Sequence, residues 1–196
     1  MKKKNIQNIC VFCGSSMGSN PIYRETAQAL GRELALRDIG LVYGGGNIGL
    51  MGVVADSVME RGGRVYGVIP QALMERELGH IGITELHIVS TMHERKAKMA
   101  EMSQAFIALP GGFGTLDELC EILTWAQLGI HHKPVGLCNV EGFFDSFLAF
   151  VERASTERFL RPEHCDLLTV QRDVSSLIEA LLSKAEEEPT HLAKWI

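Results

Sequence analysis

The sequence contains no run of about 18 consecutive apolar residues, so no transmembrane helix is expected. The apolar stretch after the first lysines is short and interrupted by Asn5, Gln7 and Asn8, which argues against a signal peptide. No strong charge of one sign is present either: the net charge is −5 and the signs are interspersed. The five cysteines, an odd number, fit reduced thiols. These features predict a cytoplasmic protein that binds neither nucleic acid nor a membrane.

Several catalytic signatures are also missing. The chain has no G-x-x-x-x-G-K-[ST] segment, which excludes a P-loop NTPase, and no G-x-S-x-G segment, which leaves serine hydrolase chemistry unsupported. His131 and His132 lack metal-ligand spacing. Cys10 and Cys13 fall in a strand-like run, where a spacing of three sends the thiols to opposite faces. We therefore expect no metal site and no cofactor.

Strand-like and helix-like segments alternate along the chain. The expected strands are 9–13, 41–43, 64–69, 85–89, 105–109, 134–138 and 167–170. The expected helices are 21–37, 49–60, 91–103, 115–128, 142–153 and 174–187, with a loop or short helix over 71–82. Strands joined by helical crossovers imply a parallel sheet covered on both faces. The sequence thus predicts one α/β domain over residues 1–196, a doubly wound, mostly parallel, Rossmann-like sheet, with 1–7 and 188–196 as flexible tails.

Three predicted strands end in glycine turns that lead towards helices, at 13–16 (including Ser15), 44–49 and 110–115. Glycine lets the backbone approach a ligand closely, and a helix N-terminus offers free N–H groups to an anion. The turn at 44–49 matches G-x-G-x-x-G, but it follows the second strand and lacks a ribose-binding acid about 20 residues later. A dinucleotide-dependent dehydrogenase is therefore disfavoured, whereas an anionic ligand at this sheet edge is expected.

Structural explanations are available for two residue pairs. Thr115 and Glu118 match a capping box, which would place Thr115 at the N-cap and Glu118 in the first turn. Glu121 follows Glu118 by three residues and shares its helix face, so the two carboxylates could instead serve chemistry in which positive charge develops on a sugar. On the preceding helix, Glu94 and Lys98 are spaced as a solvent-exposed pair at i, i+4.

The helix predicted at 91–103 carries basic residues within an apolar stripe. The stripe is formed by Met92, Met99 and Met102. Arg95 and Lys96 fall within it, and a guanidinium inside such a stripe needs an anionic partner because an unpaired buried charge is costly. That partner could be Glu118 or Glu121 in a structural ion pair, or a substrate phosphate, and these alternatives are compatible.

Two motifs and two further segments of the sequence resemble those of a known family. The segment 110–118 is similar to the P-G-G-x-G-T-x-x-E signature of the Lonely Guy family of cytokinin-activating phosphoribohydrolases. Residues 92–96 are similar to the second motif of that family, and 44–52 and 124–131 match further stretches. The resemblance spans roughly residues 8–182. Such proteins have long carried a lysine decarboxylase label, but no lysine here has an evident pyridoxal Schiff-base setting.

The resemblance implies hydrolysis of the bond between base and ribose in adenine-type nucleoside 5′-monophosphates. It implies that Arg95 and Glu118 are catalytic, and Glu121 could assist them. The family's binding residues map to Glu77, Lys96, Gly112, Phe113, Gly114, Thr115, Leu116, Asp117 and Thr124, with Glu77 resting on the segment 75–78. To these the glycine turns and the helix at 91–103 add Ser15, Gly44, Gly45, Gly46, Met92 and Gly111.

A mechanism follows from this assignment. The phosphate would dock on the 111–115 turn, Arg95 would hold the geometry, and ionised Glu118 would stabilise an oxocarbenium-like ribose and orient water. The family also forms homodimers, for which helices 91–103 and 115–128 are a plausible interface. Two alternatives stay open: an AMP nucleosidase of purine salvage, with the same residues, and a non-catalytic nucleotide or cofactor carrier.

Overall fold

The fold is built on one parallel β-sheet. A computed structural model describes residues 6–77 and 79–187. Within them, seven strands lie in the order β4-β3-β2-β1-β5-β6-β7, and all neighbouring strands are parallel. The strands are β1 (Asn8–Phe12), β2 (Gly40–Tyr43), β3 (Val65–Pro70), β4 (Glu85–Val89), β5 (Ala105–Ala108), β6 (Val135–Cys138) and β7 (Leu168–Gln171). The predicted α/β class and Rossmann-like topology are confirmed.

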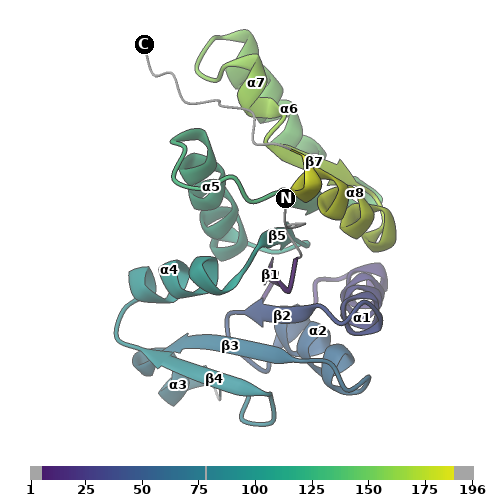
Figure 1. Cartoon of the computed structure of the whole chain (residues 1–196), viewed down its shortest axis with the longest axis vertical. Helices are drawn as coiled ribbons and strands as arrows, with labels where there is room; N and C mark the ends of the chain where they lie inside the picture. The colour runs from purple at the N-terminus through teal and green to yellow at the C-terminus, as the bar shows by residue number, and fades with distance from the viewer. Residues whose placement is uncertain (1–5, 78, 188–196) are drawn as a thin grey trace.

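Helices cover both faces of the sheet (Figure 1). One face carries α1 (Pro21–Leu36), α2 (Gly49–Met59) and α8 (Val174–Glu186); the other carries α4 (Met92–Met102), α5 (Phe113–Gln127) and α6 (Asp145–Thr156). Each face has its own hydrophobic cluster, and residues of β1 alternate between the two. Cys10 belongs to one cluster and Cys13 to the other, so their predicted opposite orientation is confirmed.

The strand order places a topological switch point between β1 and β5. From β1 the chain winds outwards through β2 and β3 to β4, then returns through α4 to β5 on the other side of β1. In such sheets, ligands bind outside the carboxyl ends of the strands at the point where the winding direction reverses. The glycine turns that follow β1 and β5 flank this point, and the turn after β2 lies next to them.

Some predicted boundaries were wrong. Helix α5 begins at Phe113, with Gly112 as its N-cap. The helix expected at 142–153 is preceded by a 3₁₀ turn, η1 (Val140–Gly142), because Asn139 accepts a hydrogen bond from Phe144 N (2.8 Å) and donates one to Asp145 (2.7 Å). The short helices α3 (Gln71–Glu77) and α7 (Pro162–Cys165) complete the fold. No helix in the described part of the chain is long and apolar enough to cross a bilayer.

The predicted tails lie mostly outside the described residues, namely 1–5 and 188–196. Ile6 and Gln7, which the prediction included in the first tail, belong to the fold. Ile6 is buried in the core, and the carbonyl of Gln7 accepts a hydrogen bond from Gly40 N (2.8 Å).

Candidate active site

Three glycine turns meet at the carboxyl edge of the sheet. Gly14 N, after β1, donates to the carbonyl of Pro110, after β5 (3.1 Å), which joins the two sides of the switch point. Leu50 N, after β2, donates to Gly14 O (3.0 Å). A side chain on Gly49 (φ +59°) would collide with the backbone of Ser15, so this close approach requires glycine. The three predicted turns therefore form one continuous surface.

The turn after β5 leaves an open helix N-terminus. No side chain caps α5, and a Cβ at Gly112 or Gly114 would meet nothing within 4 Å. Thr115 is buried and its hydroxyl packs against Gly111, whereas Phe113 is 92% exposed. An uncapped helix N-terminus with free space around its glycines suits an anion such as a phosphate.

Arg95 of α4 links the ends of two strands to α5. Its Nε donates to the carbonyl of Val68 in β3 (3.1 Å) and its Nη2 to the carbonyl of Gly44 after β2 (3.3 Å). Its Nη1 lies 3.4 Å from Glu118 Oε1, and the two side chains are only 13% and 11% exposed. Nη1 also lies 3.3 Å from the sulfur of Met92. The anionic partner that the sequence required for Arg95 is thus Glu118.

The environment of Glu118 favours its neutral form. Burial raises the pKa of this carboxyl to about 7, and Arg95 opposes the rise. Among the smaller effects, Asp117 and Glu121 raise the pKa and Lys96 lowers it. A carboxyl whose pKa lies near neutrality is available for proton transfer as well as for charge stabilisation.

Lys96 forms a second ion pair beside the first. Its Nζ lies 3.1 Å from both Asp117 Oδ2 and Glu121 Oε1, and its side chain is 11% exposed. Burial lowers the pKa of Lys96, but hydrogen bonds to Glu121 and Asp117 outweigh this effect, so the pKa is raised overall. Ion pairs from Arg95 and Lys96 of α4 to carboxylates of α5 thus place five of the predicted residues in one charged cluster, namely Arg95, Lys96, Asp117, Glu118 and Glu121.

The structural explanations for two pairs were wrong. Thr115 is the third residue of α5 and Glu118 the sixth, so they form no capping box and Glu118 lies in the second turn. The capping motif occurs instead at α4, where Thr91 Oγ1 accepts from Glu94 N (3.1 Å) and Glu94 accepts from Ser90 N (2.8 Å). Lys98 consequently pairs with Glu101 (3.2 Å) rather than with Glu94.

The remaining predicted residues are less closely tied to the cluster. Thr124 is exposed on α5, one turn after Glu121, and its hydroxyl donates to Cys120 O (2.7 Å). Leu116 of α5 is half-buried and packs against the hydrophobic cluster on that face of the sheet. The side chain of Glu77 lies outside the described part of the chain. The two main-chain carbonyls that hold Arg95, those of Val68 and Gly44, were not predicted as its acceptors; the only signal was their position near the carboxyl ends of β3 and β2.

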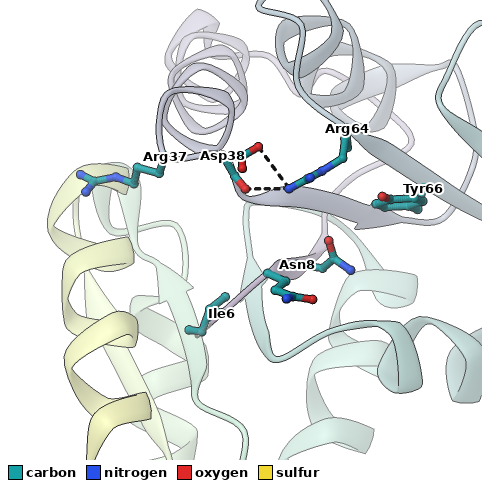
Figure 2. A pocket seen from close by; sticks show the side chains of 7 residues that line it. Ile6, Asn8, Arg37, Asp38, Arg64 and Tyr66 are labelled. Atoms are coloured by element: carbon teal, nitrogen blue, oxygen red, sulfur yellow. Dashed lines mark hydrogen bonds and ion pairs between the residues drawn. The ribbon is translucent and has the colours of Figure 1, made fainter. Parts of the chain in front are cut away.

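A further pocket lies at the opposite edge of the sheet, near the amino ends of β1 and β3 (Figure 2). It is lined by Ile6, Gln7, Asn8, Arg37, Asp38, Arg64 and Tyr66. Both guanidinium groups already have partners: Arg64 pairs with Asp38 (3.2 Å), and Arg37 pairs with Glu33 (3.1 Å) and Glu179 (3.4 Å). None of the predicted site residues lines this pocket, so we do not assign the activity to it.

Comparison with known proteins gives close relatives over nearly the whole chain. Residues 51–181 match the family model described as possible lysine decarboxylase. Cytokinin riboside 5′-monophosphate phosphoribohydrolase LOG3 of Arabidopsis thaliana is 49% identical over 97% of this chain and 87% of its own length. The probable cytokinin riboside 5′-monophosphate phosphoribohydrolase LOGL9 of Oryza sativa subsp. japonica is 51% identical over 91% of this chain and 79% of its own.

Solved structures share the fold at lower identity. A Moco carrier protein from Chlamydomonas reinhardtii has a TM-score of 0.69 at 20% identity, covering 92% of this chain and 98% of that one. The molybdenum cofactor binding protein from Rippkaea orientalis has a TM-score of 0.70 at 21% identity, with the same coverage of the two chains. At this level of identity the likeness shows the fold alone.

Proposed function

This chain belongs to the Lonely Guy family of cytokinin riboside 5′-monophosphate phosphoribohydrolases, and from that membership we propose that it hydrolyses the N-glycosidic bond of cytokinin nucleoside 5′-monophosphates. The products are the free base and ribose 5-phosphate. The observation that carries the proposal is the buried Arg95–Glu118 pair, which lies beside three glycine turns at the switch point of the sheet. A buried acid near neutral pKa next to an anion cradle suits a reaction on a phosphorylated sugar.

The phosphate is the group that we assign to the N-terminus of α5. The backbone N–H groups there lack a side-chain cap, and the open space at Gly112 and Gly114 lets phosphate oxygens approach the main chain. Binding at this point aligns the ribose with the second turn of α5, where Glu118 lies. The exposed ring of Phe113 is available to the base or to a partner subunit.

Glu118 is the catalytic carboxylate in this account. As the bond between ribose C1′ and the base nitrogen breaks, positive charge grows on the sugar, and ionised Glu118 stabilises it. Water then adds its hydroxyl to C1′ while its proton is taken up by Glu118 and passed to the departing base. Arg95 holds Glu118 in place through its bonds to Val68 and Gly44, and the Lys96–Glu121 pair fixes the spacing of α4 and α5.

We also propose that the enzyme works as a homodimer in the cytoplasm. Large apolar side chains are exposed on and near α4 and α5, namely Met92, Phe113, Leu128 and Ile130. Apolar surface gathered beside a site is typical of an interface between subunits. All five cysteines are free thiols, which fits a reducing compartment.

Product analysis tests the proposed reaction. The purified protein is incubated separately with isopentenyladenosine 5′-monophosphate and with AMP, and free base and ribose 5-phosphate are quantified. The proposal predicts equimolar products, with higher kcat/KM for the isopentenyl nucleotide. Release mainly from AMP would assign the enzyme to purine salvage with the same chemistry. Binding without release from either would refute the enzyme and favour a nucleotide carrier.

A further inference from the structure

A carboxylate–imidazole pair lies beside the Gly44–Gly46 turn. His80 Nε2 donates to Asp56 Oδ1 across 2.9 Å, and the imidazole side chain is 16% exposed whereas the carboxylate side chain is 62% exposed. Asp56 lies in α2, the helix that starts directly after the turn, and His80 lies before β4. The pair therefore connects the helix that follows the turn, α2, to the segment between α3 (Gln71–Glu77) and β4.

The backbone of the His80 segment is bound to the turn itself. His80 N donates to the carbonyl of Gly45 (2.9 Å), and Gly46 forms an isolated antiparallel bridge with Gly79. Gly45 has φ +76°, and a Cβ there would lie 3.1 Å from both Ile69 and Leu86, so the turn fits closely against the neighbouring strands. His80 thus binds the turn with its main chain and α2 with its side chain.

The first residue of the turn, Gly44, contacts Arg95 of the catalytic pair. Its carbonyl accepts from Arg95 Nη2 (3.3 Å), and a Cβ on Gly44 would collide with that guanidinium. A continuous path therefore runs from Asp56 through His80, the main chain of Gly45 and Gly44, and Arg95 to Glu118. Gly44 and Gly45 have no side chains with which to anchor the turn, so on this side the turn is held through the main-chain bond of Gly45 to His80 and the side-chain bond of His80 to Asp56.

We propose that Asp56 and His80 are positioning residues whose hydrogen bond holds the Gly44–Gly46 turn, so that the Gly44 carbonyl keeps Arg95 beside Glu118. This inference rests on the proposed function, because Arg95 and Glu118 matter through catalysis. Neither Asp56 nor His80 is assigned a contact with the nucleotide. Their effect is therefore on the geometry of the catalytic step rather than on the phosphate cradle after β5.

Steady-state kinetics of matched variants tests the proposal. Asp56→Ala and His80→Ala remove the bond, whereas Asp56→Asn retains an acceptor oxygen for His80. We expect the two alanine variants to lower kcat by about tenfold to a hundredfold, as displacement of a catalytic group does, with KM changed less than about twofold. Asp56→Asn should stay within about twofold of the wild type in kcat.

The control is Glu85→Ala, which removes another carboxylate–imidazole pair, Glu85–His87 (3.4 Å), on the neighbouring strand β4. The control should keep wild-type kcat. Wild-type kcat in Asp56→Ala, or an equal loss in Asp56→Ala and Glu85→Ala, would overturn the positioning role while leaving the hydrolase intact. An equal loss in Asp56→Asn and Asp56→Ala would overturn it too, since the retained hydrogen bond would then be irrelevant.

Hydrogen exchange gives a readout that does not depend on turnover. The peptide over residues 43–51 should exchange faster in Asp56→Ala than in the wild type or in Asp56→Asn, whereas the peptide over 105–116 should be unchanged. If the wild type releases no base, the proposed function fails, and this exchange pattern still decides whether the pair holds the turn. Equal exchange of the 43–51 peptide in all variants would show that the Asp56–His80 hydrogen bond does not hold the turn.

Discussion

Arg95 Nη1 lies 3.4 Å from Glu118 Oε1 at the carboxyl edge of the sheet, and both side chains are almost fully buried. Burial raises the pKa of the carboxyl, and Arg95 is the main group that counteracts this effect. The pair therefore balances desolvation against charge, and Glu118 titrates near neutral pH instead of near its usual value. Changes of pH, of the turn that holds Arg95 and of the neighbouring charges should therefore alter the activity or the stability of the protein.

The pH dependence of kcat/KM should follow Glu118. Because its pKa is raised to about 7 by burial, the carboxyl is protonated below that pH, and kcat/KM should fall by about tenfold per pH unit on the acidic side. Asp117→Asn removes a negative charge that raises this pKa, so the acidic limb should move to lower pH. The substrate phosphate titrates identically with every variant, and Glu157→Gln, a remote exposed change, is the control. A limb that stays in place or moves to higher pH would contradict the assignment.

Two glycines of the site should respond differently to alanine. Gly44→Ala brings a Cβ into the Arg95 guanidinium, so we expect kcat to fall about a hundredfold. Gly112→Ala meets open space, so the free energy of unfolding should change by less than about 1 kcal/mol, while ribose 5-phosphate binds more weakly because the added methyl group occupies the anion site. Urea unfolding and calorimetric titration measure both effects. Unchanged ribose 5-phosphate affinity in Gly112→Ala would place the phosphate elsewhere.

The ion pair between Lys96 and Glu121 should contribute to the free energy of unfolding. Lys96→Met leaves the carboxylates of Asp117 and Glu121 without their shared cation. We expect the free energy of unfolding to fall by about 1–2 kcal/mol, a value between those typical of exposed and of buried ion pairs. In a double-mutant cycle with Glu121→Gln, the two effects should not add. Urea denaturation of the four proteins measures this, and strict additivity would show that the contact carries no energy.

The proposed homodimer can be tested at the exposed apolar side chains near α5. Ile130→Asp places a charge at an exposed position just beyond the end of that helix and should shift sedimentation equilibrium from dimer to monomer. The matched control is Phe159→Asp, an exposed apolar residue near α7. A dimer that survives Ile130→Asp but not Phe159→Asp would move the interface to α6 and α7, and a fully active wild-type monomer would exclude a required dimer.

The fold could be predicted from the sequence because buried parallel strands are short apolar runs between glycine turns and amphipathic helices. Local hydrogen bonds set the details that were wrong. The capping box expected at Thr115 requires this residue to be the N-cap of the helix, but α5 starts two residues earlier, at Phe113, with Gly112 as its N-cap. Asn139 bonds to Phe144 and Asp145 and delays the start of α6, which no hydrophobic period could indicate.

The site could be predicted only in part. The position of Arg95 in a methionine stripe predicted that it needs an anionic partner. That this partner is Glu118 could be seen only in the structure, which places α4 beside α5. The carbonyls of Val68 and Gly44 could not be identified beforehand, since main-chain acceptors carry no residue-specific signal. The division of roles between Glu118 and Glu121 likewise depends on which cation each faces, Arg95 or Lys96.

The most direct test of the account compares base release by the wild type and by Glu118→Gln, with isopentenyladenosine 5′-monophosphate as substrate. Glutamine keeps the shape and one acceptor oxygen but carries no negative charge, so kcat should fall by about 10²–10⁴-fold while ribose 5-phosphate binds with an affinity within about threefold of the wild type. Base release by Glu118→Gln at the wild-type rate would contradict the central role of Glu118 in hydrolysis.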